Sequence, residues 1–150
     1  MDAAFVVAAI GLGLMIGLSG AGSAIGLAIS GSSALGSLKK RSDAFGTLLV
    51  ASVLPSTQGI YGFVGFFLYQ SLMTPDMGMF KAAVVLAAGL MLGLSCLISA
   101  IFQGKICASS ASAIGSGHDV LGSGLVFGAL PEFYAILSLV AAILLQGVVK

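Results

Sequence analysis

Residues 120–149 read VLGSGLVFGALPEFYAILSLVAAILLQGVV, an apolar stretch whose one charged side chain is Glu132. About 20 mainly apolar residues are enough for a helix to span the hydrocarbon core of a bilayer. The stretch is therefore predicted to be a transmembrane helix with a carboxylate near its middle. A carboxylate at that depth is costly, so Glu132, the only glutamate of the chain, is a candidate functional residue.

Three further stretches meet the same criterion. With Val120–Val149 they make four expected spans, the others being Ala3–Ile29, Ala44–Leu72 and Met79–Ile106, joined by connections at Gly31–Asp43, Met73–Gly78 and Cys107–Asp119. Each span is expected to be helical, because lipid offers the backbone no hydrogen-bond partner. The sequence thus predicts an all-α membrane protein with four transmembrane helices, in a single membrane domain covering residues 1–150. The N-terminal stretch lacks a basic start and is expected to be a retained helix, not a signal peptide.

The composition agrees with a membrane protein. Of 150 residues 59% are hydrophobic and 7% charged, and the mean hydropathy is +1.17, whereas soluble domains are about 25% charged. The net charge of +1, without a basic stripe, gives no sign of a nucleic-acid partner. Cys96 and Cys107 lie 11 residues apart on one expected helix. That spacing separates them by roughly 16 Å, too far for a disulfide.

Positive charge on the connections predicts the orientation. Lys39, Lys40 and Arg41 lie in the first connection and Lys105 near the third, whereas the second has only Lys81 nearby. The positive-inside rule therefore places the first and third connections in the cytoplasm and both termini on the other side.

The chain repeats itself. Leu54-Pro55-Ser56 matches Leu130-Pro131-Glu132 at an offset of 76 residues, and Ser33–Ser37 matches Ser112–Ser116 at an offset of 79. An insertion such as Lys39-Lys40-Arg41 accounts for the difference of three. The protein is therefore expected to be a duplicated helical hairpin, 1–72 and 79–150, with one carboxylate where the first half has Ser56. Chance similarity in Gly/Ala/Ser-rich sequence is the alternative.

Polar side chains are expected at the depth of Glu132. The second span carries Leu54, Thr57, Gln58 and Tyr61 at spacings of i, i+3, i+4 and i+7, which is one helix face. Counted from turns expected near residues 42 and 117, Thr57, Gln103 and Glu132 lie 14 or 15 residues in, roughly 21–23 Å. One carboxylate with neutral oxygens suits a small monovalent cation such as Na⁺. Interhelical hydrogen bonding to a protonated Glu132 is the alternative.

Prolines and glycines predict where the helices are irregular and where they pack closely. Pro55 and Pro131 remove a helical hydrogen bond beside the polar residues, so both helices are expected to be loosened there. Small residues let helices approach closely, and they recur at Gly13-x-x-x-Gly17, Gly22-x-x-x-Gly26 and Gly89-x-x-x-Gly93. The first and third spans are therefore expected to be the inner helices of an oligomeric assembly, with ordinary helix packing within one chain as the alternative.

The motifs resemble one family over essentially the whole chain. LPSTQGIYGF at 54–63, QGK at 103–105 and LPEFYAIL at 130–137 are similar to the c-type (K-type) proteolipid, the membrane rotor subunit of V-type ATPases. The resemblance implies a homo-oligomeric ring that turns in the lipid bilayer against a stator protein with an arginine. Central-stalk subunits on the cytoplasmic side would link the ring to the ATPase head. The proteolipid itself would not be catalytic.

The resemblance also implies an ion site. In sodium-type members the ion is held by groups matching the Leu54 carbonyl and the side chains of Thr57, Gln58, Gln103 and Glu132. A tyrosine matching Tyr61 helps close that site. We therefore expect Na⁺ to be the coupling ion, with H⁺ as the alternative, in a multi-pass protein of a bacterial plasma membrane.

Two other classes of protein fit the size and hydropathy. Small four-helix cation-coupled exporters carry their acidic residue in the first helix, whereas Glu132 lies in the last. A structural proteolipid would not need the matched oxygen groups at one depth.

Overall fold

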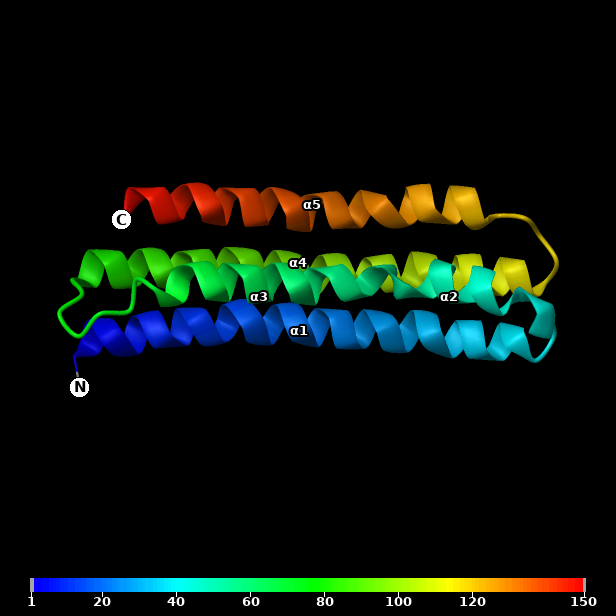
Figure 1. The fold of residues 1–150 in the computed structure, drawn as a ribbon, viewed down its shortest axis with the longest axis horizontal. Helices are drawn as coiled ribbons and strands as arrows, with labels where there is room; N and C mark the ends of the chain where they lie inside the picture. The colour runs from blue at the N-terminus through cyan, green and yellow to red at the C-terminus, as the bar shows by residue number, and fades with distance from the viewer. Residues whose placement is uncertain (1, 150) are drawn as a thin grey trace.

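The computed structural model describes residues 2–149 and consists of four helical spans packed side by side (Figure 1). In chain order the elements are α1 (Ala3–Leu38), the 3-10 turn η1 (Ser42–Ala44), α2 (Phe45–Val53), the 3-10 turn η2 (Leu54–Ser56), α3 (Thr57–Gln70), α4 (Met79–Gly115) and α5 (Leu121–Val148). Each span, with η1 to α3 taken together as one, is long and apolar enough to cross a membrane. The expected fold, an all-α multi-pass membrane protein with four spans, is confirmed.

Successive spans run in opposite directions, so both chain ends lie at one end of the bundle (Figure 1). As a consequence α1 and α4 are parallel to each other, and α5 is parallel to the span made of α2 and α3. This is the arrangement of a duplicated hairpin whose two copies share one direction across the membrane.

Two connections are shorter than predicted. α1 continues to Leu38 and α4 to Gly115, so most of Gly31–Asp43 and Cys107–Asp119 is helical and the prediction of long connections there was wrong. The hydropathy criterion measures the length that lipid covers, not the length of the helix. The polar continuation is held by neighbouring helices: Ser33 Oγ donates to the Ala108 carbonyl at 2.7 Å, and Ser37 Oγ to the Ala111 carbonyl at 2.9 Å.

The helices are consequently longer than a bilayer core. α1 has 36 residues and α4 has 37, which is roughly 55 Å of helix against about 30 Å of hydrocarbon. Since the non-polar sequence lies toward the end with the termini, the excess helix is at the opposite end, beside the connections at residues 39–41 and 116–120.

Glycines bring α1 and α4 into backbone contact. A Cβ atom on Gly104 would lie 2.6 Å from the Gly26 Cα, and one on Gly93 would lie 2.6 Å from the Leu14 carbonyl oxygen. The predicted close packing through Gly22, Gly26, Gly89 and Gly93 is thus present within the chain. Gly13 and Gly17 instead face open space, so the helix contacts predicted for them do not form within this chain.

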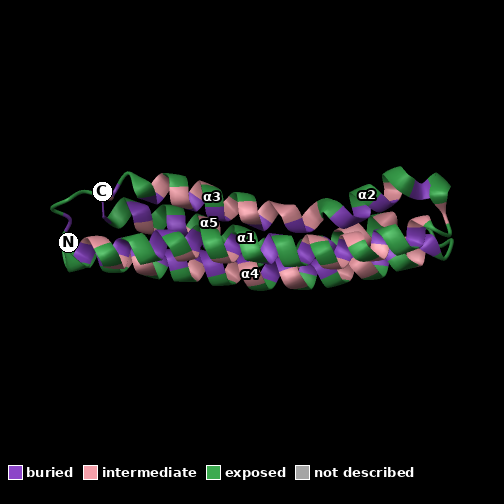
Figure 2. Ribbon diagram, turned by 90° about the horizontal axis from the view of Figure 1, so that it is seen from below, coloured by how far each residue is buried: buried purple, intermediate pink, exposed green. Residues whose placement is uncertain are grey.

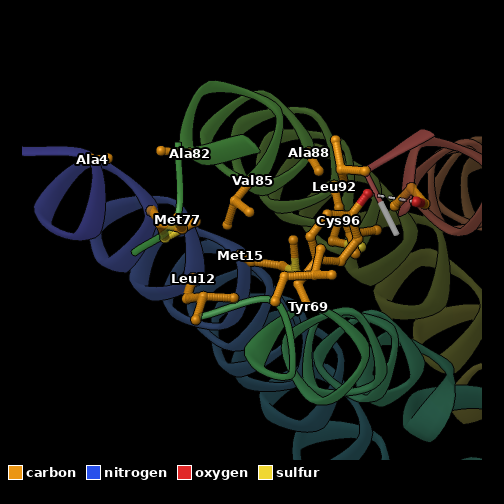
Figure 3. Close-up of a cluster of buried hydrophobic side chains, with 14 of the residues drawn as sticks. Ala4, Leu12, Met15, Tyr69, Met77, Ala82, Val85, Ala88, Leu92 and Cys96 are labelled. Atoms are coloured by element: carbon orange, nitrogen blue, oxygen red, sulfur yellow. Dashed lines mark hydrogen bonds between the residues drawn. The ribbon is translucent and has the colours of Figure 1, made fainter. Parts of the chain in front are cut away.

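The larger apolar core includes side chains from α1, α3, α4 and α5. Figure 3 shows Met15 of α1, Leu92 of α4 and Tyr69 of α3 together, and all three side chains are fully buried. Large apolar side chains such as Phe67 and Leu144 point outward and are more than 60% exposed. Figure 2 shows such exposed residues along the outer sides of the bundle. Apolar side chains in these outward positions fit a lipid environment.

The two prolines behave differently. Pro55 ends α2, and the chain passes through η2 before α3 begins, so the second span bends between α3 and α2 (Figure 2). Pro131 lies inside α5, which remains one helix, so it does not break its span as Pro55 does. The break at Pro55 has partners on α1: Ser30 Oγ donates to the Ser52 carbonyl at 2.7 Å, and the Gly59 N–H donates to Ser23 Oγ at 2.7 Å.

Candidate ion-binding site

Glu132 lies on α5, where its carboxylate contacts side chains of α3 and α4. Its two carboxylate oxygens accept hydrogen bonds from different helices. The Tyr61 hydroxyl donates to Oε1 at 2.7 Å, and Gln103 Nε2 donates to Oε2 at 2.9 Å. The carboxylate of Glu132 is thus held in place by donors from two helices.

Gln103 connects the acid to the second span. Its side chain is fully buried, and its Nε2 also donates to the Gly128 carbonyl at 2.9 Å. Its Oε1 accepts a hydrogen bond of 2.7 Å from Nε2 of Gln58, which is fully buried as well. Two neutral amides are therefore placed beside the carboxylate with all their polar atoms inside the protein.

Thr57 and Leu54 complete the predicted set. Thr57 Oγ1 lies 3.1 Å from the Leu54 carbonyl oxygen and 3.3 Å from Oε1 of Gln58. Three neutral oxygens thus lie together on one side of the Gln58 amide. The break at Pro55 helps to form this group, because the 3-10 turn ends with the Leu54 carbonyl accepting the Thr57 N–H.

All six residues predicted from the sequence therefore belong to one connected set. Tyr61, Glu132, Gln103 and Gln58 are joined in sequence by direct hydrogen bonds, and Thr57 joins Gln58 to the Leu54 carbonyl. Within residues 2–149 every buried side-chain nitrogen or oxygen has a hydrogen-bond partner. Polar residues at mid-membrane are accordingly satisfied without water.

Ser99 on α4 also contacts this set and was not predicted from the sequence. Its hydroxyl donates to the Pro131 carbonyl at 2.9 Å and accepts from Gln58 Nε2 at 3.0 Å. The signal was available, because Ser99 precedes Gln103 by four residues and so lies on the same helix face. Contacts of the Gly128 and Pro131 carbonyls had no sequence signal, since every residue has a carbonyl group.

The first hairpin has no equivalent acid. Ser56, at the position matching Glu132, bonds within its own span, where its Oγ donates to the Val53 carbonyl at 2.8 Å. His118 and Asp119 lie in the turn before α5, outside the polar set around Glu132. The chain thus forms one site, not two related ones.

The donor set defines the chemistry that the site can support. In the part of the chain that the structure describes, no group of three or more His, Cys, Asp or Glu side chains is close enough to hold a metal ion. A Zn²⁺ or Ca²⁺ site built from several charged ligands therefore does not fit there. One carboxylate with hydroxyl, amide and carbonyl oxygens fits a monovalent hard cation.

Comparison with known proteins agrees with this architecture. The chain matches the family model of the ATP synthase C subunit twice, over residues 10–69 and 86–145. It is 39% identical over 149 residues to an A-type ATP synthase subunit K of Methanocaldococcus jannaschii, covering 97% of this chain and 64% of that protein. It is 35% identical over 127 residues to a V-type sodium ATPase subunit K of Enterococcus hirae, covering 85% of this chain and 81% of that protein. The chain thus spans just under two thirds of the length of the Methanocaldococcus relative.

One match in each hairpin establishes the class of protein. The chain belongs to the family of ATP synthase C subunits, in the duplicated form represented by subunit K of A- and V-type ATPases. The two matched segments begin at residues 10 and 86, a separation of 76 residues, which confirms the internal repeat. Membership also confirms the expected class, a non-catalytic membrane proteolipid of a rotary ATPase.

Proposed function

We propose that this chain is an ion-carrying rotor subunit of a V/A-type ATPase that binds one Na⁺ at Glu132. The other ligands are the side chains of Thr57, Gln58 and Gln103 and the carbonyl oxygen of Leu54, and Tyr61 closes the site. The observation that carries the proposal is the hydrogen-bonded connection of Glu132 to neutral oxygens from two other helices.

Membrane electrostatics gives the mechanism. An ionised carboxylate facing lipid is costly, whereas a carboxylate neutralised by a cation is much less so. A subunit loaded with Na⁺ can therefore pass through lipid as the ring turns. An empty subunit is stable only beside an opposite charge, which an arginine of the stator would supply. Moving one monovalent cation against 100 mV costs about 2.3 kcal/mol, which ATP hydrolysis in the catalytic head would provide.

Two observations favour Na⁺ over H⁺. Tyr61 and Gln103 hold both oxygens of Glu132 in position beside the neutral oxygens that a cation would need. A proton needs only the carboxylate, and the oxygens of Thr57, Gln58 and Leu54 would then have no role. The Enterococcus hirae relative, named as a sodium ATPase subunit, is consistent with this choice.

Carbodiimide labelling of Glu132 tests the proposal. The reagent attacks the protonated carboxyl, so bound Na⁺ competes with labelling. In membranes containing the assembled ring, millimolar Na⁺ is expected to slow labelling, and K⁺ at the same concentration is expected to act much more weakly. Glu132→Gln serves as the control that identifies the labelled residue. Labelling that responds to pH but not to Na⁺ would instead support proton coupling, and absence of labelling would support a structural role.

The proposed assembly follows from the same role. The chain would form a ring of identical copies in a bacterial plasma membrane, facing the stator at the level of Glu132. Both termini would lie on the non-cytoplasmic side, and central-stalk subunits would contact the end with Lys39, Lys40 and Arg41. The basic residues at that end support this orientation under the positive-inside rule.

A further inference from the structure

We propose that Ser99 is a positioning residue that fixes the Gln58 amide with its oxygen toward the cation and thereby sets the preference for Na⁺ over H⁺. The inference rests on the proposed function. It concerns a residue that is not one of the predicted cation ligands. Its basis is the direction of each hydrogen bond around a buried hydroxyl.

The hydroxyl of Ser99 has one proton, and the structure shows where it goes. Ser99 is 5% exposed, and its Oγ donates to the Pro131 carbonyl at 2.9 Å. Only lone pairs of Oγ remain to face Gln58, because a serine hydroxyl has a single hydrogen. The group of Gln58 that lies 3.0 Å from Oγ must therefore be the N–H donor, Nε2.

The position of Nε2 then fixes the position of the Gln58 oxygen. One hydrogen of Nε2 is directed at Ser99 and the other at Oε1 of Gln103, at 2.7 Å. Both amide hydrogens are thus committed to the protein. Oε1 points to the opposite side, where it lies 3.3 Å from Thr57 Oγ1, which in turn contacts the Leu54 carbonyl group.

Loss of the Ser99 hydroxyl removes one of the two hydrogen bonds that hold the Gln58 amide. Without it one N–H of Gln58 lies in an apolar environment with no partner, which is unfavourable. Rotation of the amide by about 180° would not relieve this, because it would place the Gln58 oxygen against Oε1 of Gln103. The Gln58 amide is therefore held by one hydrogen bond fewer, and its oxygen is less firmly positioned for Na⁺, whereas protonation of Glu132 does not use the Gln58 oxygen. Ser99 therefore affects the two ions differently.

A cavity beside Ser99 allows a conservative test. A space of about 340 Å³ between α4 and α5 is lined by Ser95, Ile98, Ser99, Phe102, Pro131 and Tyr134. It has room for the additional methyl group of threonine, which keeps the hydroxyl. Ser95, one turn earlier on α4, provides a matched control: its Oγ donates to the Tyr134 carbonyl at 3.2 Å, a contact that does not involve Gln58.

The experiment measures Na⁺ protection of Glu132 from carbodiimide in membranes containing the complete ATPase. Ser99→Ala is expected to raise the half-protecting Na⁺ concentration by ~10-fold, the effect of losing one buried hydrogen bond. The pH dependence of labelling without Na⁺ is expected to stay unchanged. Ser99→Thr and Ser95→Ala are expected to behave like wild type. Ser99→Cys, which has a weaker hydrogen-bonding group, is expected to shift in the same direction by less, and it replaces Ser99→Ala if that ring does not assemble.

The outcomes separate the two proposals. If Na⁺ protects the wild-type ring and Ser99→Ala equally well, the role of Ser99 is wrong while the sodium site stands. An equal shift in Ser95→Ala would show that packing between α4 and α5 is responsible, and would also overturn the role of Ser99. If Na⁺ does not protect the wild type, the sodium site is wrong and the inference fails with it.

Discussion

The Tyr61 hydroxyl lies 2.7 Å from Oε1 of Glu132, although the two residues are 71 positions apart and belong to different hairpins. Tyr61 comes from α3, which follows the break at Pro55, and Glu132 comes from α5, which continues through Pro131. The contact depends on α3 and α5 both packing against the α1–α4 pair. It also places a half-buried phenol beside a carboxylate whose neighbour Gln103 is fully buried.

Removal of the Tyr61 hydroxyl tests its role in closing the site. Tyr61→Phe keeps the ring but deletes a hydrogen bond to a charged group, a loss of about 1.5–3 kcal/mol when the charge is present. We expect Na⁺ to protect Glu132 at higher concentrations than in wild type and bound radioactive sodium to exchange faster. Tyr134→Phe is the control, since Tyr134 is 68% exposed. An unchanged exchange rate in Tyr61→Phe would remove Tyr61 from the closing role.

Gln103 is the residue whose loss should be most damaging apart from Glu132. Gln103→Leu removes the amide that donates to Glu132 and to the Gly128 carbonyl and accepts from Gln58. We expect sodium transport to fall by at least about tenfold, because a buried donor on Gln58 and one oxygen of Glu132 both lose their partner. The measurement is ATP-driven uptake of sodium into membrane vesicles. Gln70→Leu, at an exposed position on α3, should transport normally, and a similar loss in that variant would point to general instability.

Gly26 is predicted to tolerate no side chain. A Cβ atom there would lie 2.7 Å from the Pro55 Cβ and would also collide with the Ala100 carbonyl group of α4. Overpacking of this kind typically costs about 1–3 kcal/mol, so Gly26→Ala should lower the thermal midpoint of the ring in detergent. Gly46→Ala, where a Cβ meets open space, is the matched control. Equal midpoints in both variants would mean that α1 moves away from Pro55 without cost.

Much of the fold could be predicted because the membrane leaves few choices. Four apolar stretches had to be helices, and their sequence similarity indicated a duplicated hairpin. The helix ends were less predictable: Ser33 and Ser37 lie outside the apolar stretches, yet α1 continues through them because their hydroxyls bond to carbonyls of α4. Such partners are contributed by a distant part of the chain, and local sequence does not specify them.

The ion site was likewise predictable in part from the sequence. Spacing placed Leu54, Thr57, Gln58 and Tyr61 on one helix face, and depth placed Gln103 and Glu132 at the same level. The sequence by itself determined which polar groups occur at mid-membrane, because polar side chains are rare enough there to be informative. Only the tertiary structure decided that Pro55 breaks its helix while Pro131 does not, and that Ser99 contacts Gln58. These features depend on which hydrogen-bond donor meets which acceptor when helices pack, and that pairing is a property of three-dimensional contact and not of residue order.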